Sequence, residues 1–156
     1  TNVWDEMVRL MEKRDVPFFN TVRNECSKYL HDKSTHTLDE AYDWFEKEER
    51  LYFIYEIDGR SIGYFRTSDW GGYKTEKTCY IGMDIHKDYR GKKLAVKAYQ
   101  EMMEYLVNNY DITMFKLEVL GSNVRAQKLY EKLGFEEVGV EILENDESIF
   151  MELEVW

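Results

Sequence analysis

The sequence predicts an α+β fold with three layers, in which helices cover both faces of a mixed, mostly antiparallel β-sheet. Three observations indicate this fold. Strand-like and helix-like patterns follow one another as strand, two helices, three strands, long helix, strand, helix and two strands. The segment 78–120 has the length of a strand–helix–strand crossover, which makes its two strands parallel. Short turns join the remaining strands, as antiparallel neighbours require.

Each element rests on a local signal. A capping box over residues 37–40 predicts the start of the second helix, and Asp58-Gly59 marks a turn between two strands. Asp15 is expected to cap the first helix, and Gly134 is expected to end the last helix. Strands are expected over 5–11, 51–57, 61–67, 78–85, 115–120, 135–143 and 148–155, helices over 15–30, 38–48, 91–109 and 123–133, and a loop over 70–73.

Composition narrows the class of protein. The 156 residues are expected to form one domain over 1–156, and 44% of them are hydrophobic, which is too apolar for a disordered chain. Without a membrane-length apolar run or a signal pattern, the chain is expected to be cytoplasmic, away from membranes, as a monomer or homodimer. Cys26 and Cys79 lack metal-like spacing and are interpreted as reduced core thiols; no metal site is expected.

Charge is distributed unevenly along the chain. The net charge is −10, which disfavours a nucleic-acid partner. Residues 86–97 nevertheless carry five basic side chains and one acid. This basic segment lies where a strand ends and a helix is expected to begin, and a helix N-terminus offers free N–H groups to a pyrophosphate. A local anion site is one interpretation, and a solvated helix face is the other.

Two segments together resemble a known family. Residues 123–135, Asn-Val-Arg-Ala-Gln-Lys-Leu-Tyr-Glu-Lys-Leu-Gly-Phe, resemble the second half of the GNAT N-acetyltransferase signature. The segment from Arg90 to Ala95 resembles the pyrophosphate loop of that family, except that Lys93 stands where glycine is usual. The resemblance implies the GNAT fold and an enzyme that transfers an acetyl group from acetyl-CoA directly to a primary amine of a small molecule. The cofactor would bind in the cleft between the parallel strands.

The resemblance also assigns roles to residues. Tyr130 would lie near the CoA sulfur and protonate the departing thiolate, which suits a phenol that is protonated at neutral pH; packing is its alternative role. Glu118 has the spacing of the general base in the ribosomal-protein alanine acetyltransferase type, with Asp84 or a water chain as rivals. Asn123 would cap its helix and contact the cofactor. The remaining residues expected to bind acetyl-CoA are Met83, Asp84, Ile85, Arg90, Gly91, Lys92, Lys93, Leu94 and Ala95.

The acceptor is less determined by the sequence. Arg23-Asn24 and the helix that ends near Trp44 loosely resemble GNAT proteins that act on nucleotide-linked amino sugars. That similarity makes Arg23, Asn24, Trp44 and Asp84 candidate substrate-binding residues, although Trp44 could equally pack its helix onto the sheet. The acidic net charge favours instead a cationic acceptor such as a polyamine or a protein N-terminus. A CoA-binding module without turnover is the non-enzymatic alternative, and Lys93 is its only support.

Overall fold

The helices and strands follow the expected order. The computed structural model describes residues 6–47, 51–71, 77–91 and 93–155. The described elements are β1 (Glu6–Leu10), η1 (Lys13–Asp15), α1 (Val16–Glu25), η2 (Ser27–Tyr29), α2 (Leu38–Lys47), β2 (Tyr52–Ile57), β3 (Arg60–Gly71), β4 (Thr78–Ile85), η3 (Lys87–Tyr89), α3 (Leu94–Tyr110), β5 (Met114–Leu120), α4 (Val124–Leu133), β6 (Glu136–Ile142) and β7 (Glu147–Glu154).

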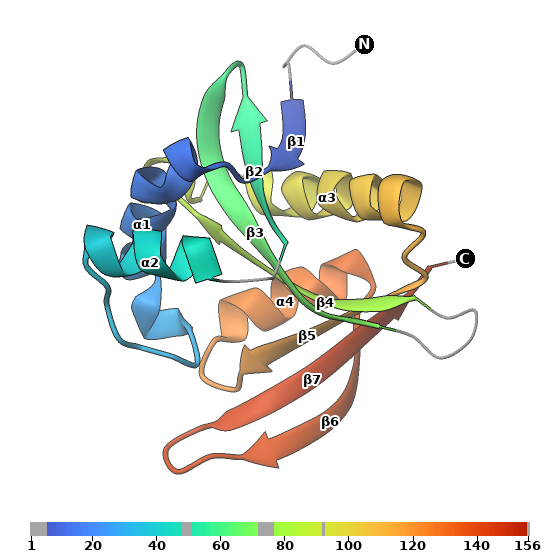
Figure 1. Ribbon diagram of the computed structural model, residues 1–156. Coiled ribbons are helices and arrows are strands. Elements are labelled where there is room, and N and C mark those ends of the chain that lie inside the picture. The colour runs from blue at the N-terminus through green and yellow to red at the C-terminus, as the bar shows by residue number, and fades with distance from the viewer. Residues whose placement is uncertain (1–5, 48–50, 72–76, 92, 156) are drawn as a thin grey trace. The chain divides into compact units, whose positions relative to one another are not determined.

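The strands form a mixed sheet. Across the described residues its order is β1-β2-β3-β4-β5-β7-β6 (Figure 1). β4 and β5 pair in parallel, with Thr78 opposite Met114 and Tyr80 opposite Lys116. The pairs β1–β2, β2–β3, β5–β7 and β6–β7 are antiparallel. The expected mixed α+β sheet with one parallel pair is therefore confirmed.

The chain divides into two compact units. The first comprises residues 1–66 and 83–94, and the second comprises residues 67–82 and 95–156. β3 and β4 each contribute residues to both units.

An aromatic cluster holds the helices of the first unit onto its strands. Phe19 of α1 stacks on Trp44 of α2 with ring centroids 4.7 Å apart, and its edge meets Tyr64 of β3 at 4.6 Å. Tyr52 of β2 lies 4.9 Å from the Trp44 ring. Offset and edge-on contacts of this kind add about 1 kcal/mol per pair to the burial of the rings. The apolar face that helical spacing gives to residues 16–25 thus packs into this cluster.

The capping box and the tight turn that the sequence predicts in the first unit are both present. The backbone N–H of Thr37 donates to Glu40 Oε1 at 3.0 Å, and the N–H of Glu40 donates to Thr37 Oγ1 at 3.2 Å. This reciprocal pair is the expected capping box, and α2 begins at Leu38. Asp58 and Gly59 both have positive φ, 51° and 78°, as the tight turn between β2 and β3 requires.

The second unit buries one face of each strand. On β5, Phe115, Leu117 and Val119 are buried, whereas Glu118 is exposed. This alternation is the expected period of two. On β7, Ile149 and Met151 are buried directly opposite Val119 and Leu117. Among the described residues, no helix combines the length and the apolar character that crossing a membrane requires.

The first helix is shorter than expected. It ends at Glu25 with Cys26 as C-cap, and a separate 3-10 turn, η2, follows. The expectation of one helix to about residue 30 was therefore wrong. Asp15 does precede α1, but its side chain makes no cap bond. Its carboxylate instead accepts from Arg9 at 2.7 and 2.8 Å and from the backbone N–H of Glu12 at 2.8 Å, and the bidentate bond to a guanidinium is the stronger of these contacts.

Two further boundaries differ from the expectation. α3 begins at Leu94, not at Gly91, because Gly91 and Lys93 adopt φ of 75° and 59°, which lie outside the right-handed helical region. β3 continues through Trp70 to Gly71, where a loop was expected. The Trp70 indole N–H donates to Thr67 Oγ1 at 2.9 Å, and its ring packs on Tyr110 at 5.1 Å. The other half of that expected loop, 72–73, lies outside the described residues.

Candidate functional site

Tyr130 lies near the end of α4 in the second unit. Asn123 caps this helix, since its Oδ1 accepts from the N–H of Ala126 at 3.2 Å, and Gly134 ends it with a φ of 101°. The Tyr130 hydroxyl lies 3.1 Å from the Tyr99 hydroxyl of α3, and the two rings meet edge to face at 5.6 Å. Tyr130 is only 9% exposed. The contacts hold the phenol in one position, which suits either proton transfer or packing.

Glu118 is the one exposed residue of β5. The Ser148 hydroxyl of β7 donates to its Oε2 at 3.4 Å, a long and therefore weak bond. The side chain is exposed, so its carboxylate is accessible from solvent.

Asp84 lies close to the end of β4 in the first unit. It is 7% exposed. Its Oδ2 accepts a hydrogen bond from the Tyr64 hydroxyl and another from Arg66 Nη1 at 2.6 Å. Burial, and then the nearby carboxylate, raise the pKa of Tyr64 well above its ordinary value. Because Asp84 already holds a guanidinium and a phenol, its position indicates a structural ion pair and argues against its use as a base.

The backbone around Asp84 requires a glycine on the neighbouring strand. A Cβ placed on Gly63 of β3 would lie 2.5 Å from the Asp84 carbonyl oxygen. Next to it, the N–H of His86 donates to the Ile62 carbonyl at 2.9 Å. Met83 and Ile85, the other expected cofactor-binding residues of β4, are half-buried. The absent side chain at Gly63 thus lets β3 and β4 approach closely where β4 ends.

Sequence reasoning missed the partners of these candidates. Tyr64, Arg66 and Gly63 surround Asp84, and Tyr99 positions Tyr130. The period of two along β3 does place Tyr64 and Arg66 on one face. This period does not predict that both side chains contact Asp84 on the neighbouring strand.

Arg90 directs its side chain toward α1. Its Nε donates to the Ile85 carbonyl at 3.0 Å, and its Nη2 lies 3.0 Å from Cys26 Sγ. Glu25 Oε2 is 3.9 Å from the same nitrogen. The guanidinium thus connects the β4–α3 segment to the end of α1. The backbone N–H of Arg90 donates to the Lys87 carbonyl at 3.3 Å, so both the guanidinium and this N–H are already bonded within the first unit.

The loop before α3 has the left-handed backbone of a glycine-rich turn. Gly91 and Lys93 have positive φ, Leu94 and Ala95 are half-buried at the start of α3, and Lys92 lies outside the described residues. The N–H groups of the first helical turn have no partner within a helix. The loop geometry therefore fits an anion-binding helix start, with a lysine at a position where glycine is less strained.

Replacing Lys93 with glycine is expected to stabilise the protein. The left-handed conformation costs a non-glycine residue roughly 1–2 kcal/mol, and the greater freedom of glycine in the unfolded chain offsets part of the gain. The expected increase in the free energy of unfolding is up to about 1 kcal/mol, measured by urea denaturation. Lys128→Gly inside α4 is the matched control and should lower it by about 1 kcal/mol. A destabilised K93G would contradict the strain argument.

The candidate acceptor residues of the first unit hold their own loop. Arg23 donates to the carbonyls of Ser34 and, at 2.9 Å, Asp32. The Asn24 amide donates to the His36 carbonyl at 2.8 Å and accepts from the His36 N–H at 2.9 Å. Trp44 is stacked on Phe19. These contacts give all three residues a structural role. Their presence is therefore no longer an argument for an amino-sugar acceptor.

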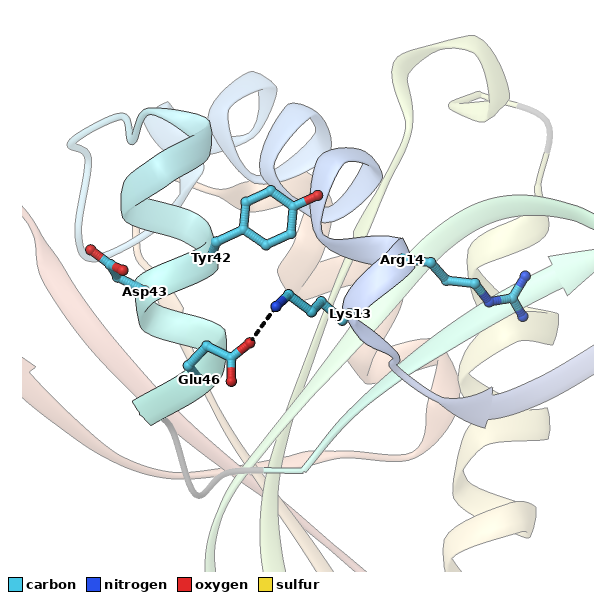
Figure 2. Close-up of a pocket in the computed structure, with 5 residues that line it drawn as sticks. All are labelled: Lys13, Arg14, Tyr42, Asp43 and Glu46. Atoms are coloured by element: carbon cyan, nitrogen blue, oxygen red, sulfur yellow. Dashed lines mark ion pairs between the residues drawn. The ribbon is translucent and has the colours of Figure 1, made fainter.

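A surface pocket of about 550 Å³ lies between η1 and α2. Figure 2 shows the side chains that line it, among which Lys13 and Glu46 form an ion pair at 3.0 Å. Both partners are more than half exposed, and pairs of this kind contribute about 0–1 kcal/mol. The lining residues are Lys13, Arg14, Tyr42, Asp43 and Glu46. None of them was a candidate residue, and their charges already offset one another.

The cysteines are unsuited to nucleophilic chemistry. Both are buried and free, as the sequence indicates. Burial raises the pKa of the Cys26 thiol to about 11 and that of Cys79 to about 12. Since the thiolate is the nucleophile, neither side chain is a reactive group at neutral pH. Among the described residues, no three His, Cys, Asp or Glu side chains gather as metal ligands would.

Comparison with known proteins gives consistent results. The model of the acetyltransferase (GNAT) family matches residues 16–135. An uncharacterized N-acetyltransferase of Methanocaldococcus jannaschii is 30% identical over 130 residues, which cover 83% of this chain and 77% of that protein. An N-alpha-acetyltransferase of Saccharolobus solfataricus is 29% identical over 67% of this chain and 71% of its own length.

A solved structure extends the similarity to nearly the whole chain. The structure of yncA from Salmonella typhimurium, determined with its cofactor acetyl-CoA, superposes with a TM-score of 0.74 at 17% identity. The match covers 96% of this chain and 94% of that one. At this identity the likeness concerns the fold.

Proposed function

Because this chain belongs to the acetyltransferase (GNAT) family and is an acetyl-CoA-dependent N-acetyltransferase, we propose that its acceptor is the α-amine of a polypeptide N-terminus. The resemblance of Glu118 to the base of enzymes that acetylate a protein N-terminus supports this acceptor. The name of the Saccharolobus solfataricus relative, an N-alpha-acetyltransferase, points the same way. The net charge of −10 favours a cationic acceptor over an anionic nucleotide sugar.

The single observation that carries the chemistry is the position of Tyr130. Its hydroxyl is buried on α4 and held by Tyr99 at 3.1 Å. In direct transfer, the amine nitrogen attacks the thioester carbonyl, the C–N bond forms and the C–S bond breaks. Tyr130 would give a proton to the departing sulfur, Glu118 would take the proton that the amine loses, and solvent would return a proton to Tyr130. Tyr99 acts as a positioning residue that fixes the phenol.

The cofactor segment is proposed to run from β4 into α3. The backbone of Met83 and Ile85 would hold the extended arm of acetyl-CoA, and the N–H groups over 91–95 would meet its pyrophosphate. Gly91 and Lys93, with positive φ, give this loop the shape that such a contact needs. Asn123 would add a cofactor contact beyond its role as helix cap. Asp84 is proposed to act through the backbone only, since its carboxylate is bonded to Arg66 and Tyr64.

A panel of acceptors tests the proposed function. Release of CoA would be measured with peptides that begin with Ser, Ala or Met, with the same peptides N-terminally blocked, and with spermidine and glucosamine. We expect turnover with free N-termini and none with blocked ones. Faster turnover of spermidine or glucosamine would overturn the proposed acceptor. Binding of acetyl-CoA without turnover of any amine would instead favour a binding module.

Replacing Glu118 with glutamine tests the base. Glutamine keeps the shape of the side chain but cannot take a proton, so Glu118→Gln should slow acetylation at pH 7 by roughly 10–10³-fold and flatten the acidic limb of the pH–rate profile. Glu136→Gln, an exposed change on β6, is the matched control and should leave both unchanged. If Glu118→Gln keeps the parental rate and acidic limb, a water chain would be the next candidate for the base.

A further inference from the structure

The outer edge of β6 carries exposed apolar side chains, and no strand among the described residues pairs with this edge. β6 is the terminal strand of the sheet that the described residues form, next to β7 (Figure 1). Val138, Val140 and Ile142 are 57%, 45% and 78% exposed. Val140 and Ile142 lie on one face by the alternation of the strand, and Val138 stands at the register shift between Glu137 and Gly139. Val140 is directly opposite Ile149, which is buried, so the apolar face of the second unit continues uncovered onto β6.

The other side of this edge is acidic. From 136 to 150 the chain has six acidic residues and no basic one: Glu136, Glu137, Glu141, Glu144, Asp146 and Glu147. Glu141 stands between Val140 and Ile142 and therefore points to the opposite face of the strand. Asp146 is used within the turn, where it accepts from Ser122. In the pairing with β7, Glu136 and Glu141 lie on the face opposite to that of Val140 and Ile142, so one face carries apolar side chains and the other carries carboxylates.

The apolar and acidic faces of β6 determine which kind of strand can pair with its edge. A strand edge with free backbone groups can accept a further strand. A second copy would place two such acidic segments side by side, and like charges directly opposite destabilise a strand pair. A strand that alternates apolar and basic residues would instead match both faces of β6. The carboxylates that oppose self-association therefore favour a cationic partner.

We propose that the β6 edge binds an extended, basic polypeptide segment as an added strand, with apolar side chains against Val140 and Ile142 and basic ones against Glu136 and Glu141. Main-chain hydrogen bonds supply the pairing, and the two faces supply the selectivity. This surface lies on strand residues to which the acetyl-transfer chemistry assigns no role.

A synthetic peptide tests the inference apart from catalysis. The probe is Arg-Val-Arg-Thr-Arg-Val-Arg with both ends blocked, so that it carries no primary amine and cannot be an acceptor. Binding would be followed by fluorescence anisotropy, and its location by backbone amide shifts in NMR spectra. We expect saturable binding that perturbs β6 amides and weakens at least tenfold between 0.05 and 0.5 M salt, since exposed charges are screened. A peptide with Glu in place of Arg should not bind.

Variants locate the surface. Ile142→Lys and Glu141→Lys should each weaken binding of the Arg peptide at least tenfold while keeping the parental melting temperature, because both side chains are exposed. Met7→Lys is the matched control, since Met7 is 47% exposed on β1, the opposite end of the strand order, and it should change affinity less than twofold. Equal binding of the Glu peptide, no binding at millimolar peptide, or a dimer that Ile142→Lys dissociates would overturn the proposal.

Discussion

Tyr130→Phe is expected to lower kcat by roughly 10–10³-fold, the span of general acid catalysis, with little change in acetyl-CoA affinity. The change removes one hydroxyl and keeps the ring, whose contacts with Tyr99 and Phe135 depend on the aromatic face and edge. Steady-state kinetics with a peptide acceptor and calorimetric titration of acetyl-CoA would measure the two quantities. Loss of affinity in proportion to kcat would instead indicate a binding role.

Two further tyrosine variants separate chemistry from packing. Tyr99→Phe keeps the Tyr130 hydroxyl but removes its neighbour at 3.1 Å, so a positioning role predicts a smaller loss, about tenfold or less in kcat. Tyr110→Phe removes a hydroxyl from the end of α3 and should leave kcat unchanged. Unchanged turnover in Tyr130→Phe would show that Tyr130 has a packing role and does not donate the proton.

Asp84→Ala should destabilise the protein by roughly 3 kcal/mol, the larger part of which is the cost of leaving charge and polarity unpaired. Without the carboxylate, the Arg66 guanidinium loses its bond at 2.6 Å, and the Tyr64 hydroxyl loses its acceptor in a fully buried position. Urea denaturation would measure the loss. Asp88→Ala, on the exposed turn η3, is the control and should change stability by less than about 0.5 kcal/mol.

A double-mutant cycle isolates the ion pair. Arg66→Met removes the charge that Asp84 neutralises, so the combination of Arg66→Met with Asp84→Asn should be less destabilising than the sum of the single changes. Asparagine still accepts from Tyr64, which limits the cost to the guanidinium. Additive losses would show that the two side chains do not stabilise each other, contrary to their geometry.

Local sequence signals predicted the elements that local physics controls. The capping box at Thr37 and Glu40, the Asp58-Gly59 turn and the Gly134 helix end each depend on residues a few positions apart. The alternation of Phe115, Leu117 and Val119 similarly needs only the period of a strand. The expected helix cap at Asp15 failed because of a contact with another element. Its carboxylate bonds to Arg9 on β1 and not to the helix that it precedes.

The same distinction between local signals and distant contacts applies to the candidate site. The sequence by itself determined the family, the parallel strand pair and the capped helix that carries Tyr130, because motif and periodicity are properties of neighbouring residues. Only the tertiary structure decided which side chains bond to these groups. Asp84 meets Tyr64 and Arg66, Tyr130 meets Tyr99, and Arg90 reaches Cys26 across 64 positions of the chain. Such partners depend on how distant segments pack, and no local period encodes that packing.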